Sequence, residues 1–206
     1  MRFQEAQVAL AAAGRELYER GWVPATSGNF SLRTTDAAIA ITASGRHKGR
    51  LGPEDILQMN LAGTIESPQK PSAETGLHLQ LYRRAPAVGA VLHTHSVAAT
   101  FASMAATAPT VNFSGLEMLK AFEGFTTHEA TLEVPVFAND QDIPRLAQQV
   151  DEYMNANGMG AAYLIRGHGL YTWARDLDGC LRHLEALEYL FDYQRLCAGA
   201  TQRVSG

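Results

Sequence analysis

Residues 88–95 read VGAVLHTH, an apolar run that ends in two histidines separated by a single residue. The length of the run and its valine and leucine content predict a buried β-strand. Side chains at positions i and i+2 of a strand point to the same side, so the imidazoles of His93 and His95 can reach one metal ion. This stretch therefore predicts both a central strand and one part of a metal site.

A third histidine lies further along the chain in Gly167-His168-Gly169, after another apolar run. Three histidines with one open position is the ligand count of a catalytic zinc site rather than of a structural one. Zinc is the default metal for three neutral imidazoles, but iron, cobalt and manganese also occupy such sites. The other histidines are isolated in the sequence and are interpreted as structural or surface residues: His47, His78, His128 and His183.

Composition narrows the class of protein. The chain has 206 residues, 46% hydrophobic and 18% charged, which is typical of one globular domain. The net charge of -4 does not indicate a surface for nucleic acid or another polyanion. Cys180 and Cys197 fall in one predicted helix, which disfavours a disulfide framework and an oxidising compartment. Without a secretory or membrane-spanning pattern, we expect a cytoplasmic protein with no membrane partner.

Helix and strand patterns alternate along the chain. Hairpin signals, such as Ala62-Gly63, argue against a purely parallel sheet. We predict a single α/β domain over residues 1–206, in three α/β/α layers with a mixed, largely antiparallel central sheet, and a loose tail at 198–206. Helices are expected at 3–20, 72–84 (with Ser72 as the N-cap), 97–106, 116–122, 143–157 and 177–196, and strands at 37–43, 56–61, 64–66, 88–95, 132–137, 161–165 and 170–173.

Two short loops rich in small residues predict a phosphate site: Thr26-Ser27-Gly28-Asn29 and Thr42-Ala43-Ser44-Gly45. Such loops expose backbone N–H groups and hydroxyls, which hold phosphate without a large net charge. Ser72 adds a donor at a helix start, and residues 46–50, RHKGR, add cations beside the second loop. Ordinary turn chemistry explains either loop by itself. Together with the histidines, the loops indicate a phosphorylated substrate.

Two glutamates are candidates for acid–base chemistry. Glu74 lies at the start of the helix after Ser72, and Glu117 lies in GLEMLK at 115–120. A carboxylate beside a metal-bound carbonyl can remove a proton α to that carbonyl. The local sequence pattern is equally typical of glutamates on the surface of a helix. Glu74 in particular would be favourable in the first turn, where a negative charge interacts with the positive end of the helix dipole. The residues by themselves predict a metal-dependent enzyme acting on a small phosphorylated carbonyl compound.

These motifs, in this order, resemble the class II aldolase and adducin family, which includes sugar-phosphate aldolases and epimerases. The motifs are Ser27-Gly28-Asn29, 42–45 (TASG), 70–74 (KPSAE), His93-Thr94-His95 and Gly167-His168-Gly169. The resemblance covers nearly the whole chain and implies the class II aldolase fold.

The same resemblance implies a set of site residues. It implies one zinc ion per subunit, held by His93, His95 and His168. It also implies homotetramers with sites near subunit interfaces, which are common in the family. The implied phosphate pocket consists of Gly28, Asn29, Ser44, Gly45 and Ser72, helped by Lys48.

Within the family, Glu117-Met118-Leu119-Lys120 resembles the Glu-Met-x-Lys element of the dehydratases of methionine salvage. The implied activity is zinc-dependent removal of water from a methylthio-substituted ketose 1-phosphate, with Glu117 as the proton-transfer residue and Glu74 as a neighbouring group or alternative base. An aldolase or 4-epimerase acting on another sugar phosphate through a zinc enediolate is the alternative, because Glu74 is retained. A non-catalytic adducin-like scaffold is the third alternative. The three intact histidines argue against it, because a scaffold does not need an open metal site.

Overall fold

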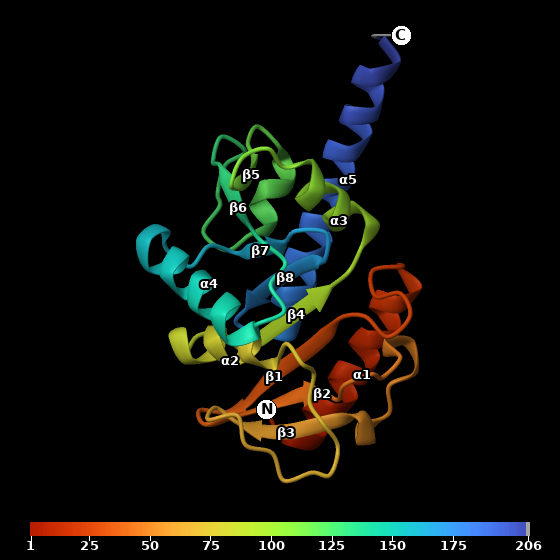
Figure 1. Cartoon of the computed structure of the whole chain (residues 1–206), viewed down its shortest axis with the longest axis vertical. Helices are drawn as coiled ribbons and strands as arrows, with labels where there is room; N and C mark the ends of the chain where they lie inside the picture. The colour runs from red at the N-terminus through yellow and green to blue at the C-terminus, as the bar shows by residue number, and fades with distance from the viewer. Residues whose placement is uncertain (205–206) are drawn as a thin grey trace.

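The computed structural model describes the backbone of residues 1–204 and the side chains of residues 1–199. At its centre is one eight-stranded sheet with the strand order β3-β2-β1-β4-β8-β7-β6-β5 (Figure 1). Strands β6 and β7 pair in parallel, and every other neighbouring pair in the described sheet is antiparallel. The predicted mixed, largely antiparallel sheet is confirmed. The strands are β1 (Asn29–Thr35), β2 (Ala38–Thr42), β3 (Ile56–Asn60), β4 (Ala90–Thr94), β5 (Thr110–Phe113), β6 (Leu132–Phe137), β7 (Ala162–Ile165) and β8 (Gly169–Ala174).

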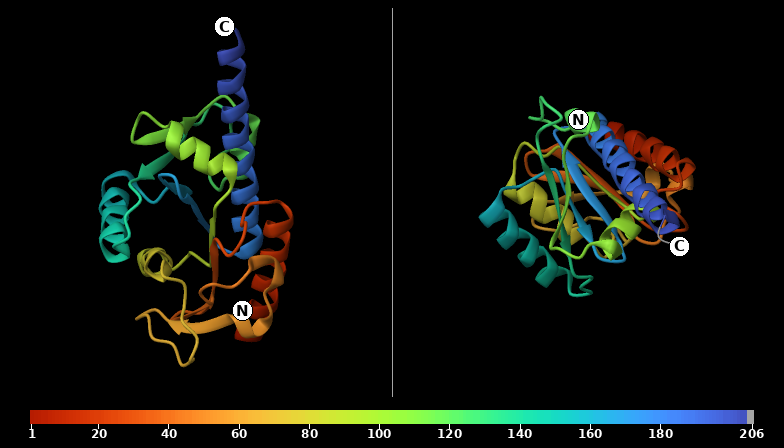
Figure 2. Two further views of the ribbon diagram at one scale, coloured as in Figure 1. Left: turned by 45° about the vertical axis from the view of Figure 1, so that its right-hand side comes forward. Right: turned by 90° about the horizontal axis from the view of Figure 1, so that it is seen from above.

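Helices cover both faces of this sheet. In the view from above in Figure 2, α1 and α5 lie on one side of the strands, and α2 and α4 lie on the other. Helix α3 packs with α5. The predicted α/β/α layering is therefore confirmed. The helices are α1 (Phe3–Glu19), α2 (Thr75–Arg84), α3 (Val97–Ala105), α4 (Ile143–Asn157) and α5 (Leu177–Val204), with short 3-10 helices η1 (Lys48–Arg50), η2 (Pro53–Asp55) and η3 (Glu117–Ala121).

Each face of the sheet has its own hydrophobic core. Leu92 of β4 belongs to the core under α1, α3 and α5, whereas the preceding Val91 belongs to the core under α2 and α4. Consecutive side chains of a strand point to opposite faces, so a strand covered on both sides is apolar at every position. This is why residues 88–92 are continuously apolar, and why β4 occupies the middle of the sheet.

Local signals fix where several elements begin. Ser96 caps α3, because its Oγ accepts a hydrogen bond of 3.0 Å from the backbone N–H of Ala99. The Asp142 side chain caps α4 through a bond of 3.1 Å from the N–H of Arg145, and Gly158 follows the last helical residue with φ of 85°. The predicted bounds of α4 are confirmed.

Four details differ from the sequence prediction. Glu74, not Ser72, is the N-cap of α2, because the Oγ of Ser72 accepts from the N–H of Glu74 in the turn before the helix. The predicted strand at 64–66 is wrong, since it makes one isolated bridge, Met59 with Ile65, while β3 pairs with β2. Strand β5 was not predicted. Helix α5 reaches Val204, within the stretch expected to be loose, and residues 205–206 lie outside the described residues.

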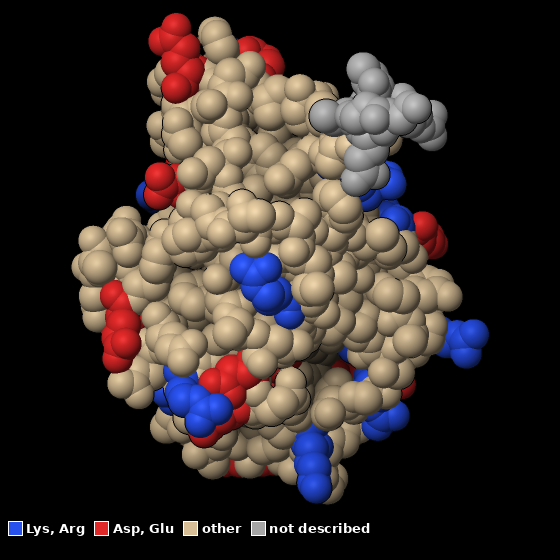
Figure 3. All heavy atoms as spheres, turned by 45° about the horizontal axis from the view of Figure 1, so that its top comes forward, with Lys and Arg blue, Asp and Glu red and all other residues tan. Residues whose placement is uncertain are grey.

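Two further observations concern membrane-spanning helices and the distribution of surface charge. None of the helices in the described part of the chain combines the length and apolar character that a bilayer crossing requires. On the face drawn in Figure 3, Lys and Arg side chains form separate groups, some of them beside Asp and Glu side chains, rather than one continuous patch. The cytoplasmic location and the single domain stay predictions.

Substituting Val150→Ala in α4 will lower the free energy of unfolding by about 2 kcal/mol, because two buried carbons leave a cavity. The Val150 side chain is fully buried against the sheet, whereas Val8 of α1 is 62% exposed. Val8→Ala is the matched control, with the same chemical change on a solvated helix face and an expected effect within about 0.5 kcal/mol. Urea unfolding of both variants measures the difference. Equal values would contradict the packing described for α4.

Candidate metal centre and active site

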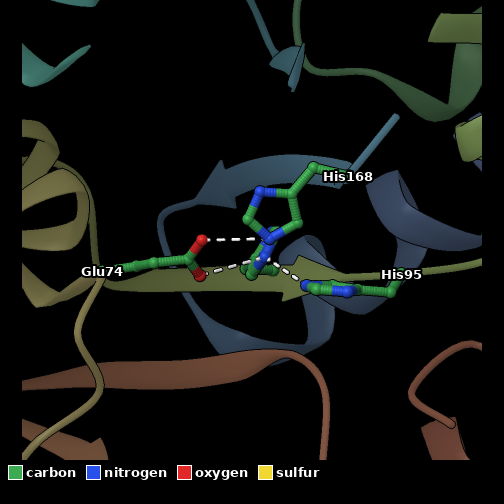
Figure 4. A group of neighbouring side chains, drawn as sticks. Glu74, His95 and His168 are labelled. Carbon is green, nitrogen blue, oxygen red and sulfur yellow. Dashed lines mark hydrogen bonds and ion pairs between the residues drawn. The ribbon is translucent and has the colours of Figure 1, made fainter. Parts of the chain in front are cut away.

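Four side chains bring their ligand atoms together at the end of β4. One ligand atom from each of Glu74, His93, His95 and His168 lies within 4.8 Å of the others. Glu74 precedes α2, His93 is in β4, His95 follows β4, and His168 is in the turn between β7 and β8. Figure 4 shows Glu74, His95 and His168 approaching one point from different elements. The structure thus brings together the three histidines that the sequence singles out.

Two glycines allow the neighbouring chain segments to approach this strand end. A Cβ atom on Gly169 would lie 2.1 Å from the carbonyl oxygen of Thr94 and 3.0 Å from Cε1 of His93. A Cβ atom on Gly28 would lie 2.7 Å from the carbonyl oxygen of His93, and Gly28 also has φ of 76°. Both positions therefore require glycine. The predicted Gly28 and the Gly-His-Gly turn shape the backbone around the histidines.

The ring of His93 is oriented by the main chain. It is fully buried, and its Nδ1 donates a hydrogen bond of 2.9 Å to the carbonyl oxygen of Leu170. In the neutral ring, the Nε2 atom then carries a lone pair. This atom lies 3.1 Å from Oε2 of Glu74 and 2.7 Å from Nε2 of His95. If Nε2 of His95 also carries a lone pair, these atoms repel one another unless a positive charge lies between them.

The protonation states suit a cation. Burial, with the neighbouring His93 and His168, lowers the pKa of His95 to about 3. Burial also lowers the pKa of His168. Burial by itself raises the pKa of Glu74, but the imidazoles of His93 and His168 and the amide of Asn29 hold it well below its usual range. Neutral imidazoles and an ionised carboxylate are the forms that bind metal, so this residue set fits a divalent ion.

The Glu74 carboxylate has further hydrogen-bond partners. Its Oε2 accepts from Nδ2 of Asn29 at 2.8 Å and from the hydroxyl of Tyr171 at 3.1 Å. The Tyr171 ring also stacks on His93, with centroids 4.0 Å apart and planes inclined by 16°. Tyr171 lies in the strand predicted at 170–173 and is fully buried in the sheet, but its hydroxyl reaches the site. Strand pairing is the signal for this, because Tyr171 lies opposite His93.

The predicted phosphate residues fall into two groups. Ser44 and Gly45 are exposed, and the N–H of Ser44 donates to the carbonyl of Lys70 at 2.9 Å, which places their loop beside the segment containing Ser72. The Asn29 side chain, in contrast, is buried and bonded to Glu74. The exposed loops can receive a ligand, whereas the Asn29 amide supports the carboxylate.

Lys48 connects the two loops of small residues, 26–29 and 42–45 with the basic stretch that follows it, through hydrogen bonds. It is 2% exposed, and its Nζ donates to the carbonyl oxygens of Thr26 at 2.9 Å and Arg46 at 2.7 Å. Burial lowers the pKa of Lys48 to about 8, and the nearby Asp55 partly opposes that shift. Its ammonium group therefore holds the loops at a fixed separation, and the phosphate contact expected of it stays a prediction.

Glu117 lies elsewhere in the subunit. Its side chain is 73% exposed on η3, with one oxygen 2.5 Å from Nζ of Lys120 and the other 4.0 Å from Nδ1 of His128. It is not a member of the donor cluster found among the described residues. Within one chain, Glu74 is the carboxylate beside the histidines.

The family model for the Class II Aldolase and Adducin N-terminal domain matches residues 8–195. The chain belongs to the class II aldolase and adducin family. It is 51% identical over 193 residues, 93% of this chain and 95% of the relative, to a protein of Pseudomonas syringae pv. syringae named methylthioribulose-1-phosphate dehydratase. A protein of the same name from Methylococcus capsulatus is 52% identical over 192 residues, 93% of this chain and 94% of the relative.

Solved structures agree with this membership. The l-fuculose-1-phosphate aldolase from Thermus thermophilus superposes with a TM-score of 0.74 at 30% identity, covering 95% of this chain and 98% of that one. YgbL from Escherichia coli gives a TM-score of 0.80 at 24% identity, covering 93% of this chain and 88% of that one, and this likeness supports the fold. The class II aldolase fold expected from the motifs is confirmed.

In this class II aldolase fold, Gly169→Ala will weaken the binding of a divalent metal by roughly 10- to 100-fold, because the added methyl group displaces the strand end that carries the histidines. Gly199→Ala is the control, since no atom lies within 4 Å of its added Cβ. Competition against a zinc-binding dye measures both affinities. Unchanged affinity in Gly169→Ala would show that the close approach does not set the histidine geometry.

Proposed function

We propose that the chain is a zinc-dependent dehydratase that converts 5-methylthioribulose 1-phosphate to 2,3-diketo-5-methylthiopentyl 1-phosphate and water, a step of methionine salvage. The observation that carries this proposal is identity of 51% over 95% of the length of a relative with that name. The cluster of three histidines and a glutamate supplies the donor set that such an enzyme needs.

His93, His95 and His168 would hold the zinc ion. Zinc, when bound, polarises the C2 carbonyl of the substrate and makes the proton on C3 more acidic. Three neutral nitrogen donors and an open position form the usual ligand set of a catalytic zinc. The ring of His93 is held in place by Leu170, and a fixed ring orientation strengthens metal binding.

The reaction transfers the C3 proton to the leaving hydroxyl and breaks one carbon–oxygen bond, and it ends when the enol loses its O–H hydrogen and gains a hydrogen at C4. A carboxylate takes the proton from C3, and the electron pair of that C–H bond forms a new C3–C4 double bond as the hydroxyl on C4 leaves. The same carboxyl group returns the proton to the leaving hydroxyl, which departs as water. The resulting enol at C3 becomes a ketone, which gives the diketone.

Two carboxylates are candidates for that proton. The Glu117-Met118-Leu119-Lys120 element favours Glu117, while a single subunit places Glu74 beside the histidines. Because Glu117 is exposed in one chain, we assign it to the site of a neighbouring subunit in a homotetramer. Glu74 is the alternative base, which needs no partner subunit.

The phosphate of the substrate is proposed to bind the exposed loops beside the cluster. Gly28, Ser44, Gly45 and Ser72 supply backbone N–H groups and hydroxyls there, and their glycines leave room for the ligand. Lys48 fixes the distance between the loops. Such a pocket selects a short phosphorylated sugar and positions C3 and C4 at the histidines.

Mass spectrometry of the product tests the proposed reaction. Zinc-loaded protein mixed with 5-methylthioribulose 1-phosphate will give a product lighter by one water. Chelator-treated protein will be inactive, and added zinc will restore turnover. Release of dihydroxyacetone phosphate would show cleavage between C3 and C4, and the chain would then be an aldolase.

Subunit complementation tests the role of Glu117. Glu117→Gln and His95→Ala will each lower turnover at least about 100-fold, since each removes proton transfer or a metal ligand. Mixed oligomers, purified through two different tags after co-expression, will regain activity because some sites combine an intact Glu117 with intact histidines.

A pair of variants in one site gives the control. Mixed oligomers of His95→Ala and His93→Ala will stay inactive. Each subunit then carries one substituted histidine, so every histidine cluster in the oligomer is damaged. Near wild-type turnover of Glu117→Gln, with loss of turnover in Glu74→Gln, would contradict the assignment and make Glu74 the base.

A further inference from the structure

A line of buried hydrogen bonds leads from the core to the Glu74 carboxylate. The Oγ of Ser31 in β1 lies 2.9 Å from the hydroxyl of Tyr82 and 2.6 Å from Nδ1 of His78, both in α2. On the other side of the ring, Nε2 of His78 contacts Oδ1 of Asn29. The Nδ2 of Asn29 is 2.8 Å from Oε2 of Glu74. The reaction proposed above gives His78, Ser31 and Tyr82 no role.

The direction of these hydrogen bonds can be worked out from the carboxylate. An ionised carboxylate only accepts, so the atom of Asn29 that faces Glu74 must be its NH₂ group. The carbonyl oxygen of the Asn29 amide then faces His78, and a carbonyl oxygen also only accepts. The Nε2 atom of His78 must therefore carry a hydrogen.

The same reasoning extends to the far end of the line. The His78 ring is fully buried, and burial, with the nearby His93, lowers its pKa to about 3, so the ring is neutral near pH 7. A neutral ring with hydrogen on Nε2 has an acceptor at Nδ1, so Ser31 donates its single hydrogen there. The Ser31 oxygen is then left to accept from the hydroxyl of Tyr82.

Every donor in this line consequently points toward Glu74. The order of donation is Tyr82 to Ser31, Ser31 to His78, His78 to Asn29, and Asn29 to Glu74. Rotating the Asn29 amide by half a turn would set two acceptors against each other at Glu74 and two donors against each other at His78. Bonds aligned in this way polarise and strengthen one another in a low-dielectric interior.

We propose that His78, fixed as its Nε2–H tautomer, is a positioning residue that orients the Asn29 amide and thereby holds Glu74 facing the histidine cluster. The proposal rests on the function proposed above, in which Glu74 belongs to the catalytic site. Oε2 of Glu74 is the oxygen that this line engages, and Oε1 lies 3.0 Å from Nε2 of His168. Each carboxylate oxygen thus has a fixed place.

Nitrogen NMR of the zinc-loaded protein, labelled with ¹⁵N-histidine, tests the tautomer without any turnover. Nitrogen shifts separate a ring nitrogen that carries hydrogen from one that does not. The signals absent from His78→Gln identify the ring. We expect hydrogen on Nε2 and none on Nδ1. Hydrogen on Nδ1, or on both nitrogens, would overturn the proposal.

Two amide substitutions test the positioning role. The terminal amide of glutamine can place a donor where Nε2 stands, so His78→Gln will keep kcat within a few-fold of wild type. Asparagine places its amide where Nδ1 stands and leaves Asn29 without a donor. His78→Asn will therefore lower kcat by roughly 10- to 100-fold, the usual effect of losing a group that orients an active-site residue, with little change in KM.

A purely structural role for His78 predicts a different pattern. Both amides would then lower thermal stability and activity together, and that result would overturn the proposal. Thermal unfolding and zinc content measured on both variants separate the two cases. If the wild-type protein fails to dehydrate the methylthio sugar phosphate, the proposed function fails, while the NMR result still decides the tautomer and the direction of the line.

Discussion

The organisation of this protein depends on one constraint at the end of β4, where the ligand atoms of three histidines and a glutamate converge. His93 cannot turn away, because its Nδ1 is bonded to the main chain of β8 and its ring lies under Tyr171. Its Nε2 therefore stays directed at Glu74 and His95. With neutral rings and an ionised carboxylate, these atoms form a donor set for a divalent cation at the end of the central strand.

The scaffold provides this constraint at little conformational cost. Strand β4 is paired on both sides, with β1 and β8, so the residues next to the cluster are held by the sheet rather than by loops. Gly28 and Gly169 permit the close approach from each side. Lys48 connects the two loops of small residues through hydrogen bonds to the carbonyl oxygens of Thr26 and Arg46. The sheet thus positions His93 directly and His95 and His168 from adjoining strand ends, while the exposed loops remain open to a ligand.

Much of this arrangement could be predicted from the sequence. The apolar run at 88–92, the histidines at i and i+2, and the Gly-His-Gly turn indicated a central strand and a metal site, and the structure brings those histidines together. Strand β5 escaped prediction because it is an edge strand of only 4 residues, too short for its alternation of polar and apolar side chains to identify a strand. Ser72 looked like an N-cap because a serine often precedes a helix, but its hydroxyl bonds within the preceding turn.

The environments of several site residues depend on tertiary packing and could not be predicted from local sequence patterns. His78 looked isolated, although its spacing of four residues from Glu74 puts both on one face of the helix start, and this was the signal that could have linked them. The exposed position of Glu117 depends on how η3 packs against the rest of the chain, which no local pattern encodes. The phosphate contact of Lys48 stays a prediction, and its burial between the two loops depends on how those loops pack.

Anomalous X-ray diffraction from crystals of the zinc-loaded protein, measured on both sides of the zinc absorption edge, tests the central claim most directly. The account predicts one anomalous peak per subunit, about 2.1 Å from the Nε2 atoms of His93, His95 and His168. No peak at that place, or a peak bound by other residues, would contradict it.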